Sequence, residues 1–97
     1  MLSRIAESLF WIGRYTERAD GTARIVDVLR LQLLEDPGAD EVTASRTVLS
    51  VIMGMPFEGD PGFADVGAAL VFDRSNASSI TGALFAAREN ARRARET

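Results

Sequence analysis

Arginine and carboxylate side chains supply the polar chemistry of this sequence. All eleven positive charges are arginines, because the chain has no lysine, and it has no histidine and no cysteine. These absences exclude disulfides, zinc sites with nitrogen or sulfur ligands, Schiff-base chemistry and catalysis by Ser–His–Asp or Cys–His groups. Each remaining cation is a planar guanidinium fork, which suits a carboxylate or a phosphate as its ligand.

Two helical stripes place such arginines one turn apart. The first stripe has the spacing i, i+4, i+7, i+11 and comprises Phe10, Arg14, Glu17 and Gly21, with Arg18 one turn beyond Arg14. The second stripe comprises Phe85, Arg88, Glu89 and Arg92. The candidate ligand-binding residues are therefore Arg14, Glu17, Arg18, Arg88, Glu89, Asn90 and Arg92. No catalytic residue, metal site or cofactor is predicted, and no enzymatic role is assigned to this chain alone.

The two stripes have two interpretations. Paired guanidinium groups on one helix face can bind a carboxylate or a phosphate, and Glu17 or Glu89 would then be the candidate base. Alternatively, the same residues form a solvated face or an inter-helix salt-bridge network. Gly13 and Gly21 also interrupt the first helix, where each costs about 1 kcal/mol relative to alanine. Close packing by another helix is the expected reason for them.

The elements that position these residues are predicted to be helices. The first helix runs from about Arg4 to Leu34 with Ser3 as its cap. Its apolar stripe at spacings of three and four residues is Ile5, Leu9, Ile12, Ala19, Ala23 and Val26, and it is widened by Trp11, Tyr15, Thr22, Leu29 and Leu33. A linker follows at about 35–40, where proline and glycine end the helix. Asp40 then caps a second helix that runs to Met53 and ends at Gly54.

A second linker at about 54–62 leads to a short apolar segment and a last helix. Residues 63–71 are predicted to form a short helix, and a strand over residues 66–72 is the alternative. Ser75 or Asn76 is the expected cap of the last helix, whose apolar positions are Ile80, Leu84, Ala87, Ala91 and Ala94. The predicted fold is all-α, a single helical domain over residues 1–97, with the first and last helices antiparallel.

Net charge and hydropathy argue against nucleic-acid binding and against a membrane-spanning helix. The net charge is −3, and the basic run at 88–95 lacks interleaved aromatic residues and contains Glu89, so nucleic-acid binding is not expected. No apolar stretch reaches the roughly 20 residues that a membrane-spanning helix needs. Glu7 and Arg14 interrupt any signal-peptide core. A cytoplasmic location in a bacterium is expected.

Two sequence blocks resemble the bacterial alpha-E domain family. The first block contains Trp11-Ile12-Gly13-Arg14-Tyr15 followed by the Glu-Arg motif at Glu17-Arg18 and by Thr22-Ala23-Arg24. The second block contains Phe72-Asp73 and then Ala87-Arg88-Glu89-Asn90-Ala91-Arg92. One departure is Asp20-Gly21, where the family usually has Glu-Asn. The resemblance implies an all-helical fold of which this chain is the N-terminal part.

The resemblance also implies partners. Alpha-E proteins accompany circularly permuted ATP-grasp ligases and transglutaminase-like peptidases, in systems that make or modify peptides. This chain would then be a helical accessory or scaffold domain whose arginines hold a peptide carboxylate or an acyl phosphate. The alternative is a purely structural protein-interaction module.

Self-association is a further expectation. A helix of about 30 residues with a wide apolar face needs more partner surface than a few short helices supply. The last helix also reaches Thr97 in mid-pattern, without a glycine or proline stop signal. A homodimer that buries the Trp11–Tyr15 side of the first helix is therefore predicted.

Overall fold

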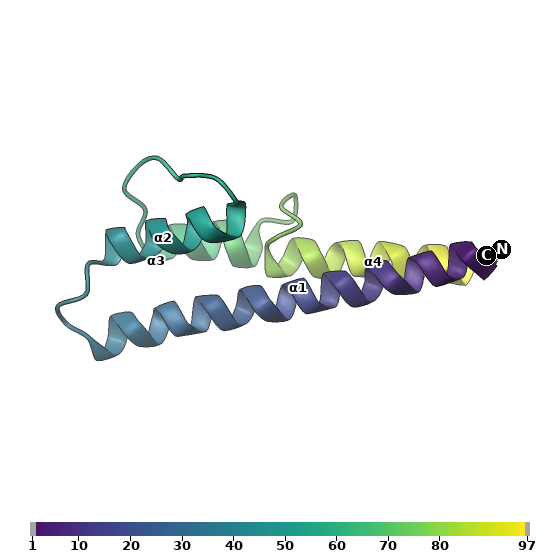
Figure 1. Ribbon diagram of the computed structural model, residues 1–97, viewed down its shortest axis with the longest axis horizontal. Coiled ribbons are helices and arrows are strands. Elements are labelled where there is room, and N and C mark those ends of the chain that lie inside the picture. Colours follow the sequence, from purple (N-terminus) through teal and green to yellow (C-terminus); the bar gives the residue numbers. More distant parts are fainter. Residues whose placement is uncertain (1, 97) are drawn as a thin grey trace.

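The computed structural model describes residues 2–96, and every regular element in that range is helical (Figure 1). The elements are α1 (Leu2–Glu35), α2 (Glu41–Met53), α3 (Phe63–Gly67), the π-helical turn η1 (Ala68–Phe72) and α4 (Ile80–Glu96). The all-α prediction is confirmed. The strand alternative at 66–72 is wrong, because the chain there continues α3 and widens into a π-helical turn instead.

The molecule is a rod of 55 × 25 × 17 Å along α1. Near the C-terminus of α1, the helix packs against α2, α3 and η1, and we call this part the head (residues 24–73). Near its N-terminus, α1 pairs with α4, and we call this part the stalk (residues 2–23 and 74–96). Figure 1 shows α4 running antiparallel to α1, as predicted.

Helix α1 begins earlier than predicted and ends where predicted. It starts at Leu2, so Ser3 lies inside the helix and is not its cap. At the other end, the Asp36 N–H still donates to the Gln32 carbonyl at 3.0 Å, and the Gly38 N–H donates to Asp36 Oδ1 at 3.0 Å. Pro37 has no N–H to continue the ladder.

Both predicted ends of α2 are confirmed. The Val42 N–H donates to Asp40 Oδ1 at 3.2 Å, and the Thr43 hydroxyl donates to Asp40 Oδ2 at 2.6 Å. At the C-terminal end, Gly54 has φ 74°, a left-handed conformation that favours glycine, and its N–H donates to the Ser50 carbonyl.

The predicted cap of α4, Ser75 or Asn76, is wrong, because the cap is Ser79, three to four residues further along the chain. Ser79, which is buried, accepts a hydrogen bond from the Gly82 N–H at 2.9 Å. Asn76 instead organises the preceding turn, where its Oδ1 accepts from the Ser78 N–H at 2.9 Å. The sequence Ser-Asn-Ala-Ser-Ser offers several capping side chains, and tertiary packing selects the one that is buried.

The head contains the aliphatic core. Leu29 of α1, Leu49 of α2, Val66 of α3 and Leu70 of η1 form one buried cluster. The partly buried residues around it are Val26, Leu33, Ala44, Val48, Ile52, Phe63 and Ala69. Burial of these side chains is the main stabilising contribution in this part of the molecule.

The stalk interface follows a heptad that contains most, but not all, of the predicted apolar positions. On α1, the buried and half-buried positions apart from Gly21 are spaced alternately by three and four residues and continue into the head: Ile5, Ser8, Ile12, Tyr15, Ala19, Thr22, Val26, Leu29 and Leu33. On α4 they include Ile80, Ala83, Ala87, Asn90 and Ala94. The predicted core positions Leu9, Ala23, Leu84 and Ala91 are exposed. A 3.5-residue repeat keeps two long helices in register, as in a coiled coil.

Candidate functional site

The arginine stripe of α1 lies on the outer surface of the stalk. Arg14, Glu17 and Arg18 are all exposed. Arg14 Nη1 lies 3.6 Å from Glu17 Oε2, and the Arg18 guanidinium lies over the Tyr15 ring at 5.6 Å from its centroid. Both contacts join residues of α1, so they do not connect the stripe to another element.

The arginine stripe of α4 also faces outward. Arg92 Nη2 donates to Glu89 Oε2 at 2.8 Å, and the Glu89 side chain is 28% exposed. Arg88, Arg92 and Arg95 line a shallow hollow together with Ala91. Within residues 2–96, Arg88 and Arg95 have no ion-pair partner. Three arginines thus line one small hollow, and Arg92 is the one that is paired with a carboxylate, that of Glu89.

Asn90 is separated from its neighbours in the stripe. It is half-buried at a heptad position of the α1–α4 interface, and its Nδ2 donates to the Ala86 carbonyl at 2.9 Å. The Thr22 hydroxyl donates to the Ser78 carbonyl at 2.8 Å, which fixes the register of the two antiparallel helices. Counted from that contact, Asn90 lies level with about residue 10 of α1. It therefore lies on the α1 side of α4, apart from the exposed arginines of the stripe.

The structure does not bring the two stripes face to face. Their arginines and Glu17 are exposed and Glu89 is half-buried, because the heptad residues occupy the facing sides of the two helices. The ion pairs of the candidate residues are within one helix, Arg14 with Glu17 and Arg92 with Glu89. Exposed pairs of this kind contribute roughly 0.3–0.5 kcal/mol each.

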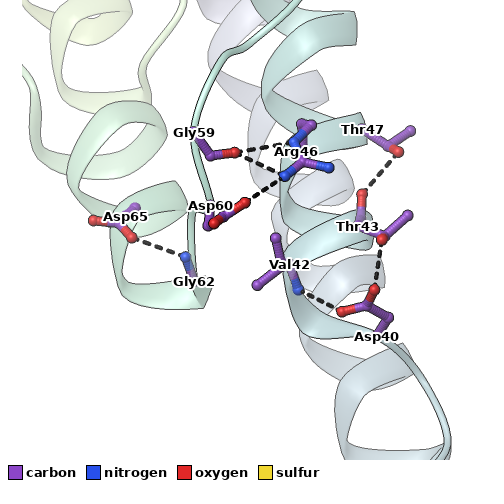
Figure 2. Close-up of polar contacts among 9 residues, drawn as sticks. All are labelled: Asp40, Val42, Thr43, Arg46, Thr47, Gly59, Asp60, Gly62 and Asp65. Carbon is purple, nitrogen blue, oxygen red and sulfur yellow. Dashed lines mark hydrogen bonds and ion pairs between the residues drawn. The ribbon is translucent and has the colours of Figure 1, made fainter.

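One arginine that joins separate segments was not among the predicted residues. Arg46 of α2 donates to the Gly59 carbonyl from Nε and Nη2, at 3.0 and 2.8 Å, and to Asp60 Oδ1 at 2.7 Å (Figure 2). Glu41 Oε2 accepts from the Phe63 N–H at 3.0 Å. These contacts fasten the 54–62 segment to α2. Their partners lie 13 to 22 residues apart, so helical periodicity gives no signal for them.

Carboxylates also order the start of each head helix. Figure 2 shows Asp40 at the start of α2 and Asp65 beside Gly62, whose N–H donates to Asp65 Oδ2 at 2.8 Å. The hydrogen bond from the Thr43 hydroxyl lowers the pKa of Asp40, with further contributions from backbone N–H groups and from Arg46. Asp40 is therefore a structural carboxylate that holds the first turn of α2.

The two glycines inside α1 are not explained by packing within the chain. Apart from the adjacent backbone of α1, a Cβ built on Gly13 or Gly21 meets no described atom within 4 Å. The expected close packing by another helix is therefore absent at both positions among the described residues. Gly82 of α4 is different, because a Cβ there would overlap the Asn76 carbonyl group.

Comparison with known proteins gives one match. The family model Alpha-E, described as a predicted alpha-helical domain with a conserved ER motif, matches residues 1–97. Neither the curated proteins nor the solved structures contain a match to the chain. Glu17-Arg18 is the one Glu-Arg pair in the sequence, and it lies on the exposed stripe of α1. Across residues 2–96, no helix is both long and apolar enough to cross a membrane.

Proposed function

This chain belongs to the Alpha-E family, and we propose that it is a helical accessory domain that binds anionic groups of a partner through α4. The observation that carries this proposal is the hollow lined by Arg88, Arg92 and Arg95. Guanidinium groups bind carboxylates and phosphates in a bidentate manner. The hollow is open to solvent, so it suits a group presented on the surface of a protein or peptide.

The proposed partners follow from the family resemblance. They are a circularly permuted ATP-grasp ligase and a transglutaminase-like protein, which act on peptides. An ATP-grasp ligase forms an acyl phosphate from a carboxylate, and both species carry the charge that the α4 arginines would bind. The exposed Glu17-Arg18 stripe on α1 supplies a second polar surface on the same stalk.

A peptide-binding experiment tests the anion-binding part of this proposal. The probe is a fluorescently labelled hexaglutamate peptide, with a hexaglutamine peptide as the neutral comparison, and anisotropy reports binding. We expect the acidic peptide to bind more tightly, and its affinity to fall as salt rises. The variant Arg88→Gln/Arg95→Gln removes two guanidinium groups that no carboxylate neutralises, and we expect at least a tenfold loss of affinity.

A matched variant controls for net charge. Arg24→Gln/Arg30→Gln also removes two arginines, but from the part of α1 that lies in the head. Equal losses of affinity in both double variants would show that the peptide responds to overall charge, and the α4 hollow would lose its role. Melting temperatures of both variants check that folding is unchanged. Mixing the chain with a purified ATP-grasp ligase, followed by size-exclusion chromatography, tests the partner.

The second candidate function is a structural interaction module without a ligand. The observation that favours it is the local pairing of Arg14 with Glu17 and of Arg92 with Glu89. Arg92→Ala separates the two candidates when stability and binding are both measured, because Arg92 both lines the hollow and pairs with Glu89. Lost binding at an unchanged melting temperature supports the anion site, whereas a parallel fall of both supports the structural module.

A further inference from the structure

A second seam runs along α1, separate from the heptad that faces α4. It has the same alternation of three and four residues and consists of Trp11, Arg14, Arg18, Gly21, Ile25, Val28 and Gln32. All of these residues are exposed except Gly21, which is half-buried. Trp11, Ile25 and Val28 are its large apolar members, and exposed apolar side chains with this spacing are the positions through which one long helix packs against another.

The head end of this seam is an apolar groove. Ile25, Val28 and Leu29 of α1 line it together with Val48 of α2, and Gln32 and Arg24 stand at its sides. Val28, one of the lining residues, is 64% exposed. The stalk end of the seam presents a large aromatic side chain, Trp11, which is also exposed. The seam thus has a hollow at one end and a bulky apolar group at the other.

The centre of the seam is open to a close approach. Gly21 lies inside α1, where glycine is less favourable than alanine by about 1 kcal/mol. Apart from the adjacent backbone of α1 itself, no described atom comes within 4 Å of a Cβ built there. Glycine permits the backbone of a second helix to come near, and none of the described helices uses that space.

The charges of the two ends are opposite. Residues 24–73 carry nine carboxylates and three arginines, a net charge of −6. The remaining residues carry eight arginines and five carboxylates, a net charge of +3. At the acidic end, Glu35, Asp36 and Asp40 lie beside the groove. At the stalk end, the seam itself carries Arg14 and Arg18.

We propose that the occupant of this seam is a second copy of the chain, packed antiparallel about a two-fold axis near the middle of α1. Trp11 of each copy then lies level with the partner's Val28 and fills its groove, and Arg14 lies level with the partner's Ile25. The basic stalk of each copy lies beside the acidic head of the other. A two-fold axis repeats both contacts and closes the assembly as a dimer.

The parallel arrangement is disfavoured by the same features. It would place the two acidic heads side by side, and Arg14 and Arg18 against their own copies, so that like charges repel. It would also set Trp11 against Trp11 and leave the two grooves facing each other empty. In the antiparallel arrangement, Trp11 fills the partner's groove and the basic stalk lies beside the acidic head.

The first test measures the oligomeric state by sedimentation equilibrium at micromolar concentrations. We expect a dimer, and we expect Val28→Glu to raise its dissociation constant at least tenfold because it buries a carboxylate in the apolar contact. Val51→Glu is the matched control, because Val51 lies on α2 outside the seam and is similarly exposed, at 69%. Circular dichroism confirms that both variants remain helical. A monomer for the natural chain, or equal effects of the two variants, would overturn the proposal.

The second test determines the orientation by disulfide formation. The chain has no cysteine, so Arg14→Cys and Ile25→Cys each introduce a single thiol. In the antiparallel dimer, two copies of residue 14 lie about 16 Å apart along the helix axis, which is too far for a disulfide. We therefore expect the mixture of the two variants to cross-link on mild oxidation, and each variant alone to remain uncross-linked. Cross-linking of Arg14→Cys with itself would establish a parallel dimer and overturn the proposal.

This inference does not depend on the proposed function. Arg88 and Arg95 lie on α4 and outside the seam, so Arg88→Gln/Arg95→Gln leaves the dimer intact if the proposal holds. A failure of peptide binding with an intact dimer rejects the proposed function alone. A monomeric chain that still binds the acidic peptide rejects the dimer alone.

Discussion

The head and the stalk are built on the same helix, α1, yet they bury different kinds of side chain along it. In the head, Leu29 packs with Leu49, Val66 and Leu70. In the stalk, the buried residues of α1 are Ser8, Ala19 and Thr22, and the buried residues of α4 include Ala83 and Ala87. Large aliphatic residues fill the space among several elements, whereas small residues let two helices approach closely. The heptad continues along the whole of α1. In the stalk it packs against α4, and in the head it packs against α2, α3 and η1.

This difference assigns different sources of stability to the two parts. Burial of apolar surface contributes about 25 cal/mol per Å², so the head gains most from its leucine side chains. The stalk buries less apolar surface and relies on close backbone approach and on specific hydrogen bonds, such as that from Thr22 to Ser78. Substitutions that remove volume should therefore damage the head most, and substitutions that add volume should damage the stalk.

The largest effect is expected from a truncation in the head core. Leu49 is 1% exposed, and Leu49→Ala should lower the free energy of unfolding by about 2–5 kcal/mol through lost burial and a residual cavity. Urea denaturation followed by circular dichroism measures it. Val51→Ala on the solvent side of α2 is the control and should change stability by less than about 0.5 kcal/mol. A small effect at Leu49 would show that the head is not the centre of stability.

Two glycine substitutions test the stalk with opposite signs. Gly82→Ala places a Cβ on the Asn76 carbonyl group, and the forced shift should cost about 1–3 kcal/mol. Gly13→Ala meets open space and should stabilise the chain by about 1 kcal/mol, because alanine favours a helix. Thermal melts of both variants measure the difference. Equal signs for the two substitutions would contradict the close approach of α4 to its preceding turn.

Much of the fold was predictable from local signals. Pro37 and Gly38 end α1, Asp40 caps α2, and Gly54 ends it, since each acts through backbone geometry within a few residues. The face of each long helix was less predictable. Leu9 and Leu84 are more apolar than Ser8 and Ala83, but the latter are buried, because close helix packing selects small residues over apolar ones. Composition alone cannot reveal that selection.

The candidate site was predictable only in part. The stripes were located on the correct helices, and their exposed arginines follow from helical spacing. Asn90 belongs to the interface instead, since its position is set by the α1–α4 register. Arg46 was missed because its partners, Gly59 and Asp60, are brought to it by the path of a loop. Hydrogen bonds between segments distant in sequence depend on the tertiary fold.

Buried hydroxyl groups distinguish the two parts at a smaller scale. The Thr22 hydroxyl in the stalk donates to the Ser78 carbonyl at 2.8 Å, so Thr22→Val should cost about 1 kcal/mol. The Ser45 hydroxyl in the head has no hydrogen-bond partner among the described residues. Ser45→Ala should therefore leave the stability unchanged or raise it by up to about 1 kcal/mol. Chemical denaturation measures both, and a loss at Ser45 comparable to that at Thr22 would indicate a partner for Ser45.

The smallest effect concerns the pH dependence of the head. The Thr43 hydroxyl holds the pKa of Asp40 below its usual value. A carboxylate with a lowered pKa in the folded state stabilises the fold above its unfolded pKa, and that contribution is lost as the pH falls through the folded pKa. Stability should therefore decrease below about pH 4. Because other carboxylates titrate in the same range, the natural chain is compared with Asp40→Asn.

Asparagine at this position still caps the helix through its side-chain oxygen, but it does not titrate. We expect the natural chain to have the higher melting temperature at pH 7, and the difference between the two proteins to shrink as the pH falls below about 4. Thermal melts from neutral to acidic pH measure that difference directly. A constant difference over the whole range would show that the charge of Asp40 does not contribute. The start of α2 would then depend on the geometry of the cap alone, as the stalk depends on the geometry of its small residues.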